Sequence, residues 1–335
     1  MNGGDVAVQR SVGETVSVPV CKLGGEDASS IAASAHGLMR VEQGLVDHPG
    51  WVAAARTQWE DLPGGIRRSI RDFRRDSGRS GALVVRGMPI ESATLAATPQ
   101  AEGSVERHAT VTAAGLLLVA CGLGEPGAFQ AEKSGALVQD IVPVRGHEEF
   151  QGNTGSTTLT FHSENAFHEH RPDYVLLLCL RSDHEAIAGL RLSCIRTILP
   201  RLSSRTKDAL FRAEFATNAP PSFGATEGGA PEHAVLTGAP DDPDFRVDFA
   251  ATRGLSTDAA QALAELSDAV DEAAHTLVLS PGDLAIVDNR VTVHGRTAFR
   301  PRYDGRDRWL QRSFSFIDIR RSRDHRPSDG YVLVK

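Results

Sequence analysis

The sequence predicts a mainly β protein with a helical annex, in which a double-stranded β-helix of the jelly-roll, cupin-like kind forms the core. Short segments rich in β-branched and other apolar residues follow one another through the second half of the chain. They lack the regular alternation of strands and helices that marks a parallel α/β sheet. Helical spacing of apolar residues is concentrated in the first third. A chain of 335 residues can bury a large core, and a single structural domain is expected.

The N-terminal region, residues 1–134, is expected to be a helical scaffold that carries the first core strand and packs on the core. Over Ile31–Phe73, apolar side chains recur at intervals of three and four residues, and the turn-forming cluster Asp61–Gly65 interrupts them. Two or three helices are therefore expected there. Ala82–Gly87 is a short β-branched run closed by glycine, which predicts a strand, and Ala109–Cys121 is a further helix candidate.

Residues 135–335 are expected to form the double-stranded β-helix itself. Its strands are predicted at Ala136–Val144, Thr157–Phe161, Tyr174–Leu180, Leu190–Ile195, Phe245–Phe249, Thr276–Leu279, Leu284–Val287 and Trp309–Ile317. Helices are expected to interrupt them at Ser203–Phe211 and Thr257–His275. The segment 217–244 is rich in Pro, Gly, Ala and Asp and has little periodicity, so it is interpreted as a long loop. Our hypothesis is that this loop forms a lid over the functional site.

Composition favours a small-molecule partner in the cytoplasm. With 36 Lys and Arg against 43 Asp and Glu, the formal net charge of −7 gives no electrostatic reason to expect nucleic acid or an anionic membrane. The four cysteines are scattered without a C-x-x-C pair, which is typical of free thiols in a reducing compartment. The stretch Met1–Lys22 lacks the apolar core of a signal peptide, and no segment approaches the length of a membrane span.

A candidate metal site begins with His162 and Glu164. Residues i and i+2 of a strand project from one face, so this imidazole and this carboxylate could reach a common ion. His294 follows the predicted strand Leu284–Val287 and offers a third ligand. Two histidines and one carboxylate on one face of a metal suit a non-haem Fe(II) centre that activates oxygen. A His-x-Glu triplet alone is a weak signal in a chain with 12 histidines and 43 acids.

Arg308 and Arg312 indicate a site for anions. Both lie at even positions of the run Arg308–Phe316, which includes most of the predicted strand Trp309–Ile317, so they share a face with the apolar Leu310 and Phe314. Burying guanidinium groups in this position requires anionic partners. The carboxylates of a dicarboxylate cosubstrate and of a substrate would supply them, because the planar fork of arginine matches a carboxylate.

These motifs together resemble the clavaminate synthase-like Fe(II)/2-oxoglutarate oxygenases, and within them the hydroxylases of free L-amino acids such as arginine, asparagine and citrulline. The resemblance covers about Gly135 to Arg321. It rests on Gly135–Gln139, His162–His168 with Arg171–Tyr174, Pro281–Asp283 with Asp288-Asn289, His294–Arg296, and Arg302–Gly305 with Arg308–Leu310.

The resemblance implies Fe(II) held by His162, Glu164 and His294 as the catalytic centre, with 2-oxoglutarate and O2 as cosubstrates. By position, it implies that Arg308 binds the far carboxylate of 2-oxoglutarate and that Ser193 can supply a hydroxyl to the same molecule. The remaining positions that it implies for substrate binding are Arg312 for the α-carboxylate, Glu132 for the ammonium group, and Asn153, Asp248 and Arg246 for other polar groups. Arginine-using members carry a second acid where Arg246 stands, which makes a guanidinium substrate less expected.

The implied reaction is hydroxylation of an unactivated carbon, C3 or C4, of a free L-amino acid with a polar side chain of the arginine, citrulline or asparagine type, in specialised (antibiotic) biosynthesis. Two other classes stay open: a zinc-dependent hydrolase on the same three residues, and a non-catalytic β-barrel binding protein. The hydrolase would leave Arg308 and Arg312 without a use. The intact His162, Glu164 and His294 set argues against the binding protein. The amino acid, the stereochemistry, any later oxidation and the oligomeric state are left open.

Overall fold

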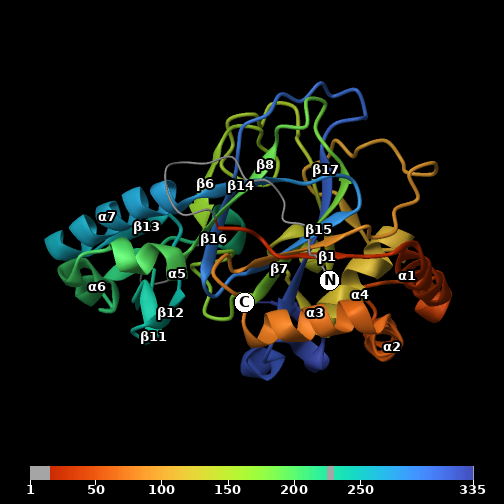
Figure 1. Ribbon diagram of the computed structural model, residues 1–335, viewed down its shortest axis with the longest axis horizontal. Helices are drawn as coiled ribbons and strands as arrows, with labels where there is room; N and C mark the ends of the chain where they lie inside the picture. The colour runs from red at the N-terminus through yellow and green to blue at the C-terminus, as the bar shows by residue number, and fades with distance from the viewer. Residues whose placement is uncertain (1–15, 225–229, 335) are drawn as a thin grey trace.

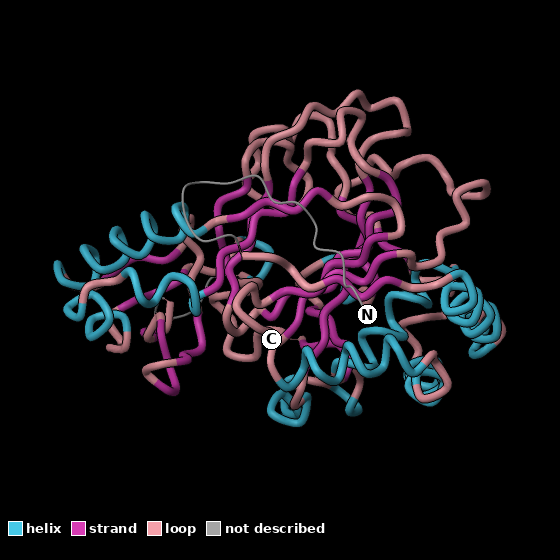
Figure 2. Tube along the Cα trace, in the orientation of Figure 1, coloured by secondary structure: helices cyan, strands magenta, loops and turns pink. Residues whose placement is uncertain are grey.

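The computed structural model describes residues 16–224 and 230–334, and in it a central body of strands lies between two groups of helices (Figures 1 and 2). The larger of the two main sheets has nine strands. Its main path runs β1-β2-β15-β7-β17-β4-β18, and β5 pairs with both β17 and β3. The strands are β1 Val20–Lys22, β2 Ala82–Arg86, β3 Val105–Glu106, β4 Glu125–Phe129, β5 Val138–Ile141, β7 Tyr174–Arg181, β15 Asp283–Asp288, β17 Trp309–Phe316 and β18 Val332–Leu333.

The smaller main sheet has four antiparallel strands in the order β14-β8-β16-β6. They are β6 Leu159–His162, β8 Gly189–Cys194, β14 His275–Val278 and β16 Thr292–Arg296. The inner faces of the two sheets share one apolar core, to which the smaller sheet contributes Leu190, Leu192 and Leu277 and the larger sheet Val175 and Leu310. Two facing sheets of this kind are the double-stranded β-helix that the strand pattern predicts.

The first group of helices covers the outer face of the larger sheet. It consists of α1 Gly25–Leu38, α2 Pro49–Trp59, α3 Gly64–Arg75 and α4 Val111–Leu123. Every residue of α4 is buried, because this helix packs against β17 on one side and against α1, α2 and α3 on the other. A helix enclosed in this way is apolar all round instead of on one face. The expected helices of this region are confirmed, but the region also contributes β1, β2, β3 and β4 to the larger sheet.

The second group covers the outer face of the smaller sheet, at the left of Figure 1. It consists of α5 Ile195–Ile198, α6 Ser204–Leu210 and α7 Thr257–Ala273, which share a second apolar core with Phe161 and Val293. Arg191 of β8 reaches outward to Asp271 of α7 at 2.8 Å. The described residues also form short 3-10 helices: η1 Val41–Gly44, η2 Lys133–Gly135, η3 Leu199–Arg201, η4 Pro221–Phe223, η5 Ile319–His325 and η6 Pro327–Asp329.

Two expectations for the region after α6 are wrong. The segment 217–244 is not a continuous loop, because its described residues and their neighbours form two small antiparallel sheets. Their strands are β9 Phe215–Thr217, β10 Glu232–His233, β11 Leu236–Ala239, β12 Asp242–Phe245 and β13 Thr252–Gly254. Phe245–Phe249 is not a strand of the main sheets: Phe245 ends β12, and the residues after it lie along β6 through an isolated bridge between Asp248 and His162 and two backbone hydrogen bonds. The lid stays a prediction, and residues 225–229 within it lie outside the described part.

Within the described residues, no helix is long and apolar enough to cross a bilayer. All four cysteines are free thiols. Burial raises the pKa of Cys121 to about 12 and that of Cys194 to about 11, so both are protonated at neutral pH. The signal-peptide expectation concerns mostly residues 1–15, which lie outside the described part, and the cytoplasmic location stays a prediction.

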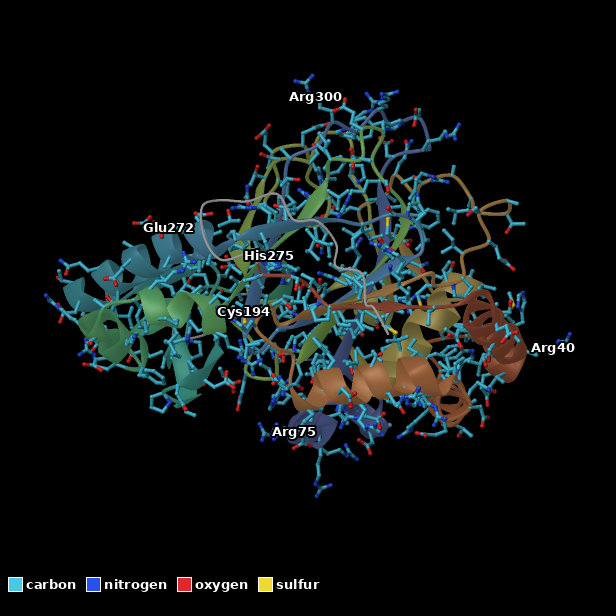
Figure 3. The ribbon with its side chains drawn as sticks, in the orientation of Figure 1. Arg40, Arg75, Cys194, Glu272, His275 and Arg300 are labelled. Atoms are coloured by element: carbon cyan, nitrogen blue, oxygen red, sulfur yellow. The ribbon has the colours of Figure 1, made fainter. Side chains whose placement is uncertain are left out.

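His275 predicts a pH dependence of stability. Its side chain is 6% exposed at the start of β14, and its Nε2 has no hydrogen-bond partner among the described residues. In Figure 3 it falls within the outline of the molecule, whereas Arg40, Arg75 and Arg300 project from the edge. Burial lowers the pKa of His275 from 6.5 to about 4. Between these values the unfolded chain binds more protons than the folded one, so stability falls as the pH drops from 6.5 towards 4.

The expected loss is about 3 kcal/mol once the pH is below 4. Urea unfolding of the metal-free protein between pH 4 and 8 measures it. His275→Leu should remove this part of the slope, whereas the surface change His36→Ala should keep it. An unchanged slope in His275→Leu would show that other groups cause the acid sensitivity.

Candidate active site

His162, Glu164 and His294 meet at one end of the smaller sheet. His162 is the last residue of β6, and the antiparallel register places His294 of β16 directly opposite it. Opposite residues of an antiparallel pair share a face, and the centres of the two imidazole rings lie 4.5 Å apart. Glu164, two residues beyond His162, brings its carboxylate to the same place. One ligand atom from each of the three residues lies within 4.8 Å of the others.

The three side chains are held in an orientation suited to a metal. His162 directs Nδ1 to the carbonyl oxygen of Thr160 at 2.9 Å, which leaves Nε2 for a ligand bond. His294 Nε2 lies 3.5 Å from Glu164 Oε2. Two imidazoles and one carboxylate converging in this way fit a divalent non-haem iron and leave other coordination positions for small molecules.

Asn289 fixes the backbone of Glu164. Its side-chain oxygen accepts from the Glu164 N–H at 2.7 Å, and its Nδ2 donates to the carbonyl oxygens of Glu164 and Pro172 at 3.1 and 2.8 Å. Asn289 is fully buried and cannot bond to water, and these three bonds pair its side-chain oxygen and both of its amide hydrogens within the protein. In the sequence, Asn289 is part of the Asp288-Asn289 motif that contributes to the family resemblance, but the motif does not predict this role.

The charges of the site suit metal binding. Burial by itself would raise the pKa of Glu164, but the Arg312 guanidinium and His294 outweigh it and hold that pKa below its usual range. Glu164 is therefore a carboxylate. Burial and the neighbouring His162 lower the pKa of His294, which favours the neutral imidazole that a metal requires.

Arg312 lies at the centre of a buried polar cluster beside these three residues. Its guanidinium is 3% exposed. Nη1 donates to Glu164 Oε1 at 3.0 Å, Nη2 donates to Glu132, and Nε donates to Gln139 Oε1 at 3.2 Å. The side-chain oxygen of Asn153 lies 3.4 Å from Nη1. The structure thus brings together four of the residues expected from the sequence, and adds Gln139 of β5.

Of the two acids in this cluster, Glu132 is the one whose pKa is raised. Burial and the negative Glu164 raise its pKa, and the ion pair with Arg312 opposes that rise. Its other oxygen lies 3.5 Å from Asn165 Nδ2. Glu132 is thus a buried acid whose ionised form depends on the positive charge beside it.

Asp248 and Arg246 lie on the segment beside β6. The backbones of Asp248 and His162 form an isolated antiparallel bridge. On either side of it, the Ser163 N–H donates to the Val247 carbonyl oxygen and the Phe249 N–H donates to that of Phe161, so this segment lies along β6. Asp248 therefore shares a face with His162. Arg246 donates to the carbonyl oxygens of Ala166 and Phe167 at 2.5 and 3.1 Å, so it braces the turn after Glu164.

Arg308 and Arg296 are two further buried arginines. Arg308 is 7% exposed and Arg296 is 4% exposed, and each guanidinium lies against the ring of Phe299, at 5.8 and 5.4 Å from its centre. Within residues 16–224 and 230–334, neither forms an ion pair. Burial and the repulsion from Arg308 lower the pKa of Arg296 to about 9.

Ser193 does not contact this site, and the expectation for it is wrong. Its neighbour Leu192 pairs with His294 across β8 and β16, so Leu192 points to the inner face and Ser193 to the outer one. The Ser193 hydroxyl donates to the carbonyl oxygen of Val270 in α7 at 2.9 Å.

A double-stranded β-helix that presents two histidines and a glutamate beside buried arginines defines the class of non-haem iron oxygenases that use a 2-oxo acid. Comparisons with known proteins agree. Residues 232–314 match the family model described as taurine catabolism dioxygenase TauD, TfdA family. L-asparagine oxygenase of Streptomyces coelicolor is 57% identical over 314 residues, 93% of each chain. Clavaminate synthase 2 of Streptomyces clavuligerus is 33% identical over 81% of this chain and 85% of its own.

Among solved structures, asparagine oxygenase in complex with Fe(II), 2S,3S-3-hydroxyasparagine and succinate superposes with a TM-score of 0.90. It is 56% identical over 94% of this chain and 99% of its own. The chain therefore belongs to the clavaminate synthase-like Fe(II)/2-oxoglutarate oxygenases. It is a hydroxylase of a free amino acid that uses iron and 2-oxoglutarate, as the sequence motifs predict.

Proposed function

We propose that this protein hydroxylates free L-asparagine at C3, with His162, Glu164 and His294 as the iron ligands. The single observation that carries the choice of ligands is the convergence of these three side chains within 4.8 Å, beside the Arg312 and Glu132 ion pair. The choice of asparagine is supported by the relative named L-asparagine oxygenase. Asparagine has one methylene carbon, C3, and so one unactivated position on its side chain.

The iron, when bound, supplies the oxidising chemistry that places one oxygen atom of O2 on the substrate carbon, while 2-oxoglutarate becomes succinate and CO2. The protein residues bind and orient. Glu164, held as a carboxylate and fixed through Asn289, offers the anionic ligand. The buried arginine Arg308 is the proposed partner of the far carboxylate of 2-oxoglutarate, because a buried guanidinium needs an anion.

The Arg312 and Glu132 pair is the proposed site for the amino and carboxylate groups of the substrate. An amino-acid zwitterion presents the same two charges as this ion pair. Its carboxylate can accept from Arg312, and its ammonium can donate to Glu132, so both buried charges keep a partner. Bound in this way, the substrate would place its side chain beside the face that His162 and Asp248 share.

Asp248 and Asn153 are the proposed contacts for the side-chain amide. Asp248 shares the face of His162, and a carboxylate accepts hydrogen bonds from an amide NH2 group. Asn153, beside Arg312, can both donate and accept. Arg246 is engaged with backbone carbonyls and leaves no second acid for a guanidinium, which disfavours arginine as the substrate.

A substrate screen tests this proposal. Succinate release from 2-oxoglutarate should be strongly stimulated by L-asparagine, and mass spectrometry should show one added oxygen on that amino acid. L-aspartate has the same shape but would bring a carboxylate against Asp248. Its kcat/KM should therefore be lower by more than about tenfold, because like charges at close range cost over 1.4 kcal/mol. Turnover of L-arginine or L-citrulline without turnover of L-asparagine would reject asparagine as the substrate.

A further inference from the structure

Arg296 is a buried charge to which the proposed function assigns no role. It follows His294 by two residues on β16, so both side chains point to the inner face of the smaller sheet. Its Nη2 donates to the carbonyl oxygen of Thr157 at 2.9 Å. Its Nε is buried and has no hydrogen-bond partner among the described residues. One backbone carbonyl therefore satisfies only part of a guanidinium that offers five N–H groups.

Arg296 and Arg308 approach one another from opposite sheets. Arg296 belongs to β16 of the smaller sheet, and Arg308 immediately precedes β17 of the larger one. The ring of Phe299 lies against both guanidinium groups. The space between the two sheets therefore contains two buried positive charges beside one aromatic ring.

The protein provides little negative charge to balance them. Asp183 is the carboxylate that acts on Arg308. Both of its oxygens already accept backbone N–H groups: Oδ2 from Glu185 and Ile187 at 3.2 Å, and Oδ1 from Ala188 at 2.8 Å. Two buried guanidinium groups without an ion pair are unfavourable unless an anion comes to them. A carboxylate has lone pairs enough to accept from two arginines at once.

We infer that Arg296 is a second binding residue for the distal carboxylate of 2-oxoglutarate and forms, with Arg308, a two-arginine clamp. The inference deepens the proposed function and rests on the 2-oxoglutarate role of Arg308. The clamp would make binding depend on a second carboxylate at the far end of the 2-oxo acid. It would thus contribute to selecting a dicarboxylate cosubstrate over a 2-oxo acid with an apolar tail.

The test compares two 2-oxo acids that share the metal-chelating end. 2-Oxoglutarate carries the distal carboxylate, and 2-oxobutyrate lacks it. Their dissociation constants are measured without oxygen by calorimetry on the Mn(II)-loaded protein, so turnover plays no part. Arg296→Gln should weaken 2-oxoglutarate binding about 10- to 100-fold, the range for one lost charged hydrogen bond, and leave 2-oxobutyrate binding within about twofold. Arg296→Lys, which keeps the charge, should recover part of the loss.

Control variants separate the possible failures. Arg191→Gln, on the outer face of the neighbouring strand β8, should bind both acids as the unmodified protein does. If Arg296→Gln weakens both acids equally, or weakens neither, Arg296 is not part of the clamp and only this inference fails. If Arg308→Gln also leaves 2-oxoglutarate binding unchanged, the proposed cosubstrate site itself is wrong. Retained Mn(II) affinity in each variant shows that the centre is folded.

Discussion

His294→Ala is expected to abolish iron-dependent turnover. His294 provides one of three converging ligand atoms, and alanine leaves only His162 and Glu164 for the ion. The loss should exceed the roughly 10- to 100-fold typical of residues that only orient a metal ligand. Two measurements check it: iron content after anaerobic loading and gel filtration, and asparagine-dependent succinate release.

The matched control is His36→Ala, because His36 is an exposed histidine of α1, far along the chain from the site. It should keep both its iron and its activity. Normal iron content and turnover in His294→Ala would remove His294 from the metal centre. The same result would favour another cluster of metal-binding groups, such as His184 with Asp304 and Asp307, as the site of the ion.

Arg312→Met is expected to destabilise the metal-free protein by about 3–5 kcal/mol at pH 7.5, because it leaves buried carboxylates without their positive partner. Glu132 and Glu164 both lose an ion pair. The deficit should shrink as the pH falls towards 5.5. Glu132 already has a raised pKa, and removing Arg312 raises it further. An acid with a raised folded-state pKa contributes stability when protonated, and that stability is lost as the pH rises through the folded-state pKa.

Urea unfolding at the two pH values provides the measurement. The double variant Arg312→Met with Glu132→Gln should be more stable than Arg312→Met alone at pH 7.5, since it removes one of the uncompensated charges. A deficit below about 1 kcal/mol, the upper end of what exposed ion pairs contribute, would mean that water screens the cluster despite its burial. A deficit that does not change with pH would mean that lost packing of the arginine, and not charge, is responsible.

The sequence predicted the larger elements well because their signals are local. The helices α4 and α7 and the strands β7, β15 and β17 carry long apolar runs or strong helical spacing, and each was expected within a few residues of its observed bounds. The strands β9 to β13 were missed. They are two to four residues long, and their segment is rich in Pro, Gly and Asp, so pairing with distant partners decides their conformation.

The candidate metal ligands could be found from sequence because two of them are local. His162 and Glu164 stand two residues apart at a strand end, and that spacing alone places them on one face. Asn289 could have been marked as a support only by its place in a motif. Its bonds to Glu164 join residues 125 positions apart, which no local pattern reveals.

The amino-acid sequence by itself determined the inventory: a β-rich core, a His-x-Glu pair with a distant histidine, and arginines on a strand that ought to be apolar. The tertiary structure alone decided which of these groups meet. The register of β8 against β16 turned Ser193 outward, and the pairing of β6 with β16 set His294 against His162. The facing of the two sheets brought Arg296 towards Arg308. The physical reason is that alternation fixes only relative faces within a strand, whereas long-range pairing and core burial choose the face that points inward.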